Sequence, residues 1–281
     1  MTTRRDAVKA LAALAVAGLA PREAMAATGE PRRIERVGVQ LYTVREAAKK
    51  NLLATIADLR RLGYREVEFA GYHGNALAPL RQTLDELGMT APSTHVGIED
   101  VTTRFDATAE AAHALGVRFL TVASIDTAPL KTADDWKRLA DTFNAIGRRA
   151  RGAGLRFAFH NHSVEFAPVD GRIPFEILLS GTDEGYVAFE LDIYWAVKAG
   201  QDPRQLFTRH SRRFSMVHLK DATAAPAQTM TEVGSGVIDW KAILALREKA
   251  GIQHYFVEHD APADPMGSVR KSADYLLGLQ F

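Results

Sequence analysis

The chain has 281 residues, 47% hydrophobic and 25% charged, with 21 glycines and 11 prolines; these globular proportions exclude a disordered, collagen-like or coiled-coil protein. The absence of cysteine excludes disulfides, thiolate metal sites and a cysteine nucleophile. The 35 Lys+Arg nearly balance the 34 Asp+Glu, and the usual basic excess of a polyanion-binding protein is missing, so we expect no nucleic-acid partner.

Residues 1–26 have the pattern of a twin-arginine export signal. Arg4 and Arg5 precede an apolar run over 10–20 and an Ala-Met-Ala cleavage site that ends at Ala26. The run is shorter than the ~20 residues that span a bilayer, so we expect no stable membrane anchor. Cleavage leaves residues 27–281, with 31 basic and 32 acidic residues and a net charge of −1. The pattern predicts a periplasmic protein, and the alternative is an amphipathic N-terminal helix.

After residue 27, short β-rich apolar runs alternate with longer segments of helical period. The strands are predicted at 37–42, 66–70, 90–96, 118–124, 155–162, 187–194, 214–220 and 254–260. Helices are predicted between them, for example over 45–63 and 133–154, and several end in a glycine that suits a C-cap: Gly63, Gly88, Gly116, Gly154 and Gly251. Eight such units without an internal linker predict a single-domain α/β fold, the (β/α)8 TIM barrel. A doubly wound sheet is the alternative, but the first turn lacks a glycine-rich motif.

Polar residues collect where the predicted strands end, which is where barrels of this kind place their active sites. On each of four strands, two of these residues are two positions apart and therefore share a face. These pairs are His160/His162, Glu190/Asp192, His218/Lys220 and Glu258/Asp260. Imidazole and carboxylate ligands suit Mn²⁺, Co²⁺, Fe²⁺, Ni²⁺, Zn²⁺ or Mg²⁺, so we expect one divalent ion whose identity stays open.

Five segments carry a family resemblance: FHNHSVEF, LDIYWAVKAGQDP, VHLKD, EVGSGVIDW and VEHD, in this order. With them, residues 35–279 resemble the sugar phosphate isomerase/epimerase family, the xylose isomerase-like barrels. The resemblance implies a divalent ion held by Asp192, His218 and Glu258, and by a strand-5 residue that is usually Glu. In this chain His160 stands there, so the expected metal ligands are His160, Asp192, His218 and Glu258.

This departure affects the expected chemistry. The family's ketose epimerases use a pair of glutamates from strands 5 and 8, and this chain has only Glu258 of that pair. We expect a metal-dependent isomerase or epimerase that removes a proton α to a carbonyl of a sugar or keto-sugar. The alternatives are a lyase or hydratase that acts on 3-keto-glycosides or inososes, and a non-catalytic sugar-binding barrel.

Roles follow from this chemistry. Glu258 is the expected base, and His160, His162 or Glu165 is the acid partner; Glu165 could also replace the missing strand-5 carboxylate. Lys220 would lie beside the developing oxyanion, or form a salt bridge to Asp221 or Asp260. The remaining candidates are expected to contact the substrate or support the site: Gln40, Tyr42, Glu68, His95, Glu190 and Trp195. Tyr42 and Trp195 suit sugar stacking or wall packing.

Residues 222–240 form a long predicted loop that suits a lid. Gly234 and Gly236 within it could offer backbone N–H groups to an anion, and Asp239 is the predicted N-cap of the next helix. The sequence contains no cluster of basic residues for a phosphate, so we expect an unphosphorylated small-molecule sugar substrate. A homo-oligomer stays possible. An apurinic-site endonuclease, which shares the barrel, is disfavoured by the net charge of −1 and the export signal.

Overall fold

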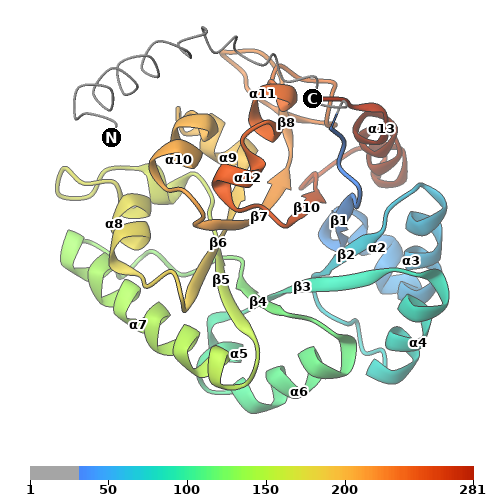
Figure 1. The fold of residues 1–281 in the computed structure, drawn as a ribbon, viewed down its shortest axis with the longest axis horizontal. Coiled ribbons are helices and arrows are strands. Elements are labelled where there is room, and N and C mark those ends of the chain that lie inside the picture. Colours follow the sequence, from blue (N-terminus) through green and yellow to red (C-terminus); the bar gives the residue numbers. More distant parts are fainter. Residues whose placement is uncertain (1–31) are drawn as a thin grey trace, which may run out of the picture. The chain divides into compact units, whose positions relative to one another are not determined.

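The computed structural model describes residues 32–281, which form a closed barrel of eight parallel strands with helices outside it (Figure 1). The strands of the barrel are β1 (Gly38–Gln40), β2 (Glu66–Phe69), β3 (Thr90–Val96), β4 (Phe119–Val122), β5 (Arg156–His160), β6 (Val187–Asp192), β7 (Phe214–Leu219) and β10 (His254–Val257). The predicted TIM barrel and its eight strands are confirmed, although most strands end a few residues earlier than predicted. The residues that follow the strands therefore belong to the connections that carry the site.

One compact unit spans Arg33–Phe281. The predicted signal peptide, residues 1–26, lies outside the described residues. Tyr64 links the first part of this unit to the last helix, because its buried hydroxyl donates a 2.7 Å hydrogen bond to the carbonyl of Val269.

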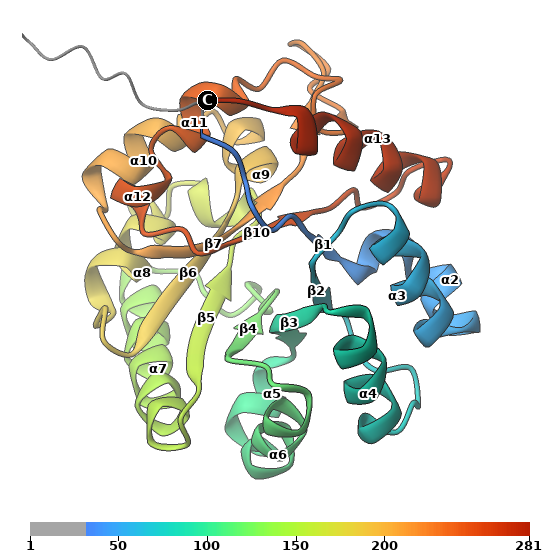
Figure 2. The ribbon, with the colours of Figure 1, turned by 45° about the vertical axis from the view of Figure 1, so that its right-hand side comes forward.

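The helices lie outside the barrel (Figures 1 and 2). They are α2 (Arg45–Lys50), α3 (Leu52–Arg61), α4 (Leu77–Leu87), α5 (Ile98–Thr102), α6 (Phe105–Leu115), α7 (Ala133–Gly152), α8 (Pro174–Gly181), α9 (Ile193–Lys198), α10 (Pro203–Arg209), α11 (Trp240–Leu244), α12 (Arg247–Ala250) and α13 (Pro265–Gly278), with short 3-10 helices η1 (Leu41–Val44) and η2 (Val164–Phe166). Within residues 32–281, no helix is long and apolar enough to cross a membrane.

The predicted helix over 45–63 is divided in two, which corrects the sequence-based expectation. Asn51 is extended, with φ −160° and ψ 94°, and its side chain accepts a hydrogen bond from the backbone N–H of Ala54. Asparagine competes with the helix backbone in this way, so it ends α2 and caps α3. The predicted glycine C-caps are observed with positive φ, for example at Gly88 (60°) and Gly116 (74°).

An apolar layer crosses the interior of the barrel beneath the polar site residues. Phe119, Ala158, Ala188, Met216 and Phe256 form a small buried cluster. Side chains two positions apart on a strand share a face, so this cluster lies on the same strand faces as the predicted site residues that follow it. The larger core packs the other strand faces against the helices. The apolar cluster is thus the floor beneath the polar site.

Candidate active site

The pairing of β5, β6 and β7 determines which polar residues meet. His160 on β5 pairs with Glu190 on β6, and Asp192 on β6 pairs with His218 on β7. Glu190 and Asp192 share a face at successive levels, and Asp192 lies nearer the carboxyl end of the strands. Glu258 directly follows β10. The polar groups therefore gather at the end of the barrel where the sequence places them.

A cavity of about 590 Å³ opens over these groups, within the range of about 300–1,000 Å³ usual for small-ligand sites. Its lining residues are Tyr42, Ala70, Gly71, His95, Val96, Gly97, Asp100, Ala123, Ser124, His160, His162, Lys220, Glu258 and Asp260. The cavity thus brings together residues from connections that are far apart in the sequence.

Asp192, His218 and Glu258 form one group of potential metal ligands, with one donor atom from each within 4.8 Å of the others. All three side chains are buried. His218 Nδ1 lies 2.7 Å from Glu258 Oε2. Asp192 Oδ1 accepts a hydrogen bond from the N–H of Trp195 and caps α9, whereas the buried Oδ2 faces Lys220 Nζ at 2.9 Å. The structure thus brings together three of the four residues expected as metal ligands and leaves a carboxylate oxygen directed at the site.

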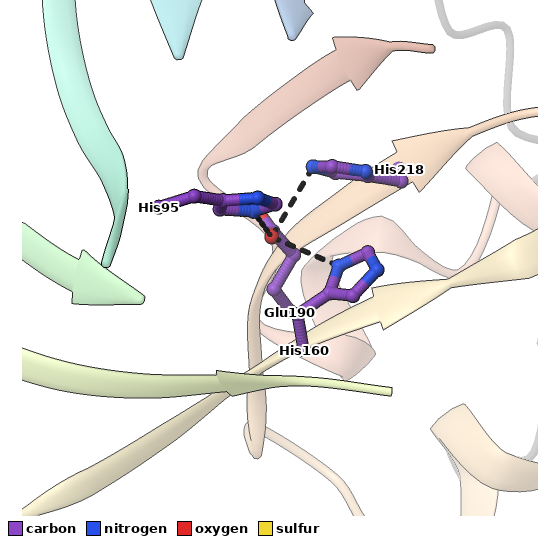
Figure 3. A group of neighbouring side chains, drawn as sticks. All are labelled: His95, His160, Glu190 and His218. Atoms are coloured by element: carbon purple, nitrogen blue, oxygen red, sulfur yellow. Dashed lines mark hydrogen bonds and ion pairs between the residues drawn. The ribbon is translucent and has the colours of Figure 1, made fainter. Parts of the chain in front are cut away.

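His160, the fourth expected ligand, lies beside this group with Nε2 3.6 Å from Asp192 Oδ2. It also belongs to a second, overlapping group of potential ligands with His95, Glu190 and His218 (Figure 3). Three ring nitrogens surround Glu190 Oε2, at 2.9 Å from His95, 3.1 Å from His160 and 3.2 Å from His218. The sequence had placed His95 and Glu190 with the substrate contacts, and their participation in a ligand group is a finding of the structure.

Glu68 and Glu190, both fully buried, hold the ring nitrogens that face away from Asp192 and Glu258. His160 turns Nδ1 to Glu190 and keeps Nε2 for the side of Asp192. His218 turns Nε2 to Glu68 at 2.7 Å and keeps Nδ1 for the side of Glu258. Buried carboxylates orient metal-ligating imidazoles in this way, by fixing which nitrogen carries the proton.

Gln40 supports Glu68 from the first strand. Its amide nitrogen donates to Glu68 Oε2 at 2.7 Å, and its amide oxygen accepts the N–H of Tyr42. Ser93 donates a further hydrogen bond to Glu68. Gln40 and Glu68 are fully buried. Their observed partners are thus groups of the chain itself, beneath the cavity.

Lys220 lies among three carboxylates. Its Nζ is 2.9 Å from Asp192 Oδ2, 2.7 Å from Glu258 Oε2 and 2.7 Å from Asp260 Oδ1. The predicted salt bridge to Asp260 is therefore observed, whereas Asp221 binds elsewhere, as described below. Burial alone would lower the pKa of the Lys220 ammonium, but the three carboxylates outweigh burial and raise this pKa well above its ordinary value.

The imidazoles fall into charged and neutral groups. Burial alone would lower the pKa of His218, but Glu190 and Glu258 outweigh burial and raise it well above its ordinary value. Burial and the charge on His218 instead lower the pKa of His160 well below its ordinary value. Burial, with a contribution from Lys220, lowers the pKa of His162 to about 4. His160 and His162 are thus neutral near pH 7.

The remaining acids differ from one another in pKa. Burial raises the pKa of Asp192 to about 6, although Lys220 opposes this shift. Glu258 has the opposite shift, because Lys220 and His218 outweigh its burial and hold its pKa well below the usual range. Burial raises the pKa of Glu165, whose carboxylate accepts the backbone N–H of His162 at 2.8 Å.

The two predicted stacking residues occupy different surroundings. The Trp195 ring lies 5.7 Å from that of His162, centroid to centroid, which places it near the cavity wall. Tyr42 lines the cavity, is 44% exposed, and has the Arg45 guanidinium 4.2 Å from its ring centroid. Tyr42 therefore presents an exposed aromatic face at the cavity mouth.

Asp221, the other predicted partner of Lys220, instead faces the loop over residues 222–240 and is not part of either ligand group. Its buried carboxylate accepts hydrogen bonds from the loop donors Ala222 N, Gly234 N, Gly236 N, Ile238 N and Trp240 Nε1. The anion that the backbone N–H groups of Gly234 and Gly236 bind is thus the Asp221 carboxylate. The loop contains a two-stranded hairpin, β8 (Asp221–Ala222) and β9 (Met230–Thr231), and Asp239 caps α11 as predicted.

Asn161 and Asp100 are site residues that the sequence analysis missed. The Asn161 side chain accepts the N–H of Asp192 at 3.0 Å, so it positions the backbone of a ligand residue. Its place between two histidines in the predicted strand over 155–162 was the available signal. Asp100 lines the cavity from α5, and no strand-end pattern marks it.

Comparison with known proteins agrees with this architecture. The family model of the xylose isomerase-like TIM barrel matches residues 56–279. Inosose dehydratase from Lacticaseibacillus casei is 27% identical over 197 residues, which cover 58% of this chain and 65% of that protein. Inosose dehydratase from Geobacillus thermodenitrificans is 28% identical over 171 residues, 54% of this chain and 57% of that protein. The chain thus spans less than two thirds of the length of these curated relatives.

A solved structure extends the comparison over more of the chain. The sugar phosphate isomerase/epimerase from Parabacteroides distasonis superposes with a TM-score of 0.76 at 25% identity. The match covers 87% of this chain and 98% of that one. The fold, the place of the polar site and the matching family model agree, and the chain belongs to the family of xylose isomerase-like TIM barrels.

Proposed function

We propose that the chain is a divalent-metal-dependent enzyme that removes the proton α to the carbonyl of a keto-sugar or a related cyclic ketone. The observation that carries the proposal is the meeting of Asp192, His218 and Glu258 at one point, with His160 beside them. The ring nitrogens on the far sides of both histidines are held by buried carboxylates. Such an arrangement is typical of ligands held ready for a metal ion.

The residues present fit a divalent ion. Mn²⁺, Co²⁺, Mg²⁺ and Zn²⁺ all bind oxygen or imidazole nitrogen ligands, and they differ in which of the two they prefer. Asp192 Oδ2 is buried and forms an ion pair with Lys220 at 2.9 Å, so this oxygen already faces a positive charge at the site. His160, Asp192, His218 and Glu258 would hold the ion. A bound ion would polarise the substrate carbonyl and so acidify the adjacent C–H.

The chain's own groups supply the proton acceptor and the positive charge. The Glu258 carboxylate lines the cavity and is held ionised, so it is the proposed base. Lys220 also lines the cavity, and its ammonium would lie beside the oxygen on which negative charge develops. His162, neutral at pH 7, would accept a substrate hydroxyl's hydrogen bond. Glu165 is the proposed second acid or base, and Tyr42 and Trp195 would pack against a sugar ring.

We favour elimination over epimerisation. Epimerisation by two facing carboxylates needs a second carboxylate where this chain has His160. Elimination needs no second carboxylate at that position: Glu258 takes the proton as the C–H bond α to the carbonyl breaks, a C=C bond forms, and the β C–O bond breaks. The hydroxyl leaves as water with a proton from an acid, for which Glu165 is the proposed group. The curated relatives named inosose dehydratase support a reaction of this class. Isomerisation also uses one base, and the structural relative named isomerase/epimerase supports it as the second candidate.

The cavity favours an unphosphorylated substrate. Among the described residues that line it there is no arginine, and its one lysine already contacts three carboxylates. A phosphate dianion normally requires basic side chains that are free to bind it. The proposed substrates are therefore keto-sugars, inososes or 3-keto-glycosides, reached in the periplasm after export by the twin-arginine route.

Hydrogen exchange tests the proposal directly. In D₂O, the Mn²⁺-loaded enzyme should exchange the α-proton of a substrate drawn from free ketoses, inososes and 3-keto-glycosides, as followed by NMR. Glu258→Gln should slow exchange by about 10²-fold or more, because it removes the base. Asp192→Ala should lose both bound metal and exchange, whereas Glu110→Gln, at an exposed position of α6, should match the wild type.

Two results would contradict the proposal: no metal-dependent exchange with any of these substrates, or unchanged exchange in Glu258→Gln. Product analysis then separates the candidates. Loss of water identifies elimination, and a product of unchanged mass identifies isomerisation.

A further inference from the structure

Lys220 is a buried cation that contacts two of the proposed metal ligands, Asp192 and Glu258. Its side chain is 2% exposed, and its Nζ lies within 2.9 Å of Asp192 and 2.7 Å of Glu258. It also lines the cavity together with Glu258 and Asp260. The ammonium therefore occupies the side of these carboxylates from which a ligand or ion would approach.

Lys220 contacts the same oxygen atoms that would bind a metal. Asp192 Oδ1 is engaged as the N-cap of α9, so Oδ2 is the oxygen left for an ion, and Oδ2 is the one that faces Lys220. Glu258 Oε2 is shared between His218 and Lys220. An ammonium and a dication on the same oxygens would repel each other strongly in a buried site.

Asp260 is a third carboxylate partner for the Lys220 ammonium, and it is not one of the proposed metal ligands. It lies 2.7 Å from Lys220 Nζ, and its side chain is 31% exposed, at the border of the cavity. Its backbone is held in place, because Arg45 donates a 2.9 Å hydrogen bond to the Asp260 carbonyl. Lys220 can thus keep one carboxylate partner while it releases the other two.

We propose that Lys220 is a displaceable counter-cation, which neutralises Asp192 and Glu258, yields them to a divalent ion, and retains Asp260. This inference rests on the proposed function for the identity of the metal ligands. Lys220 is then a determinant of metal affinity, and its ammonium moves toward the cavity when the ion binds.

Calorimetric titration with Mn²⁺, and separately Zn²⁺, tests this on full-length protein previously dialysed against a chelator. Lys220→Met should bind Mn²⁺ about tenfold more tightly than wild type or better, a gain of about 1.4 kcal/mol. Lys220→Arg keeps a competing charge and should show no such gain. Lys241→Met, at an exposed position of α11, is the matched control and should bind as wild type does. Circular dichroism establishes that each variant is folded, and Lys220→Gln replaces Lys220→Met if that variant is not.

Asp260→Asn separates displacement from a general charge effect. It should weaken Mn²⁺ binding in the wild-type background, because the displaced ammonium loses its partner. The same change in the Lys220→Met background should have much less effect. Equal effects in the two backgrounds would mean that Asp260 acts on the ion independently of Lys220, and would overturn the proposed movement.

The outcomes for the inference and for the proposed function are distinguishable. If wild type binds metal and Lys220→Met binds no more tightly, the inference is wrong and the proposed metal site stands. If only Lys220→Met binds metal, the inference stands and the metal requirement of the proposed function is wrong. If neither binds metal, both are wrong.

Discussion

At the scale of single residues, Glu165 is a buried acid with no basic side-chain partner among residues 32–281. Its carboxylate accepts the N–H of His162, and burial raises its pKa above the ordinary value of 4.5. The folded protein therefore binds a proton at Glu165 more tightly than the unfolded chain does. Stability from this residue is present below pH 4.5 and is lost as the pH rises through the folded-state pKa.

The substitution Glu165→Gln should remove the loss of stability that accompanies ionisation of Glu165. The free energy of unfolding of the variant, relative to wild type, should increase as the pH rises from about 4 to 7, because Gln carries no charge to bury. Urea unfolding at a series of pH values measures the difference. A pH-independent difference would show that Glu165 titrates in the folded state as it does in the unfolded chain.

His160 occupies the position where the family resemblance leads us to expect a glutamate. His160→Glu would restore that carboxylate but place it beside Glu190, whose Oε2 lies 3.1 Å from His160 Nδ1. We expect the single variant to lose about 3 kcal/mol of stability, since it replaces a buried partner with a like charge. Glu190→Gln in the same chain should recover much of the loss.

Chemical denaturation of the two single variants and the double variant measures this coupling. Metal retention by the double variant, checked by metal analysis, would show that a carboxylate at position 160 can serve as a ligand. Simple addition of the two single effects would contradict direct contact between the residues.

At the scale of elements, the loop over residues 222–240 depends on one carboxylate. Asp221 accepts hydrogen bonds from donors spread along the loop, and a Cβ at Gly236 would lie 2.2 Å from Asp221 Oδ1. The loop is thus ordered from within, by a residue adjacent to Lys220. This explains the two glycines of the loop: Gly234 and Gly236 bring their backbone N–H groups close to the Asp221 carboxylate.

Asp221→Asn should loosen this loop. The amide places an NH₂ group against N–H donors, so at least one charged hydrogen bond is lost, at a cost of roughly 2–3 kcal/mol. Hydrogen exchange measured by mass spectrometry should show faster exchange over 222–240 and unchanged exchange in α7. Uniform acceleration across the barrel would show a global effect, and no acceleration would show that other contacts order the loop.

At the scale of the whole molecule, export stays a prediction of the sequence. Replacement of Arg4 and Arg5 by Lys should hold the precursor in the cytoplasm, because the paired arginines are the feature that marks the twin-arginine route. Cell fractionation measures the distribution, and N-terminal analysis of exported wild type should begin at Ala27. Normal periplasmic yield from the double-lysine variant would exclude this route.

The sequence alone was sufficient for the fold and for the location of the site. Strand and helix periodicity is a local property, so eight alternating units could be read without tertiary information. The alternation of side chains along a strand likewise placed His160, Asp192, His218 and Glu258 on faces that meet at one end of the barrel. The structure brings Asp192, His218 and Glu258 together there, with His160 Nε2 3.6 Å from Asp192 Oδ2.

Only the tertiary structure decided how deep in the barrel each site residue lies and which side chains it contacts. Side-chain alternation assigns a face but not a level, because the level depends on the register between strands, which shifts between Phe189 and Glu190. Glu68 and His218 meet at 2.7 Å although 150 positions separate them, and no local pattern relates such residues. Lys220 likewise meets its carboxylates through strand pairing between distant segments, because β7 lies between β6, which carries Asp192, and β10, which Glu258 follows.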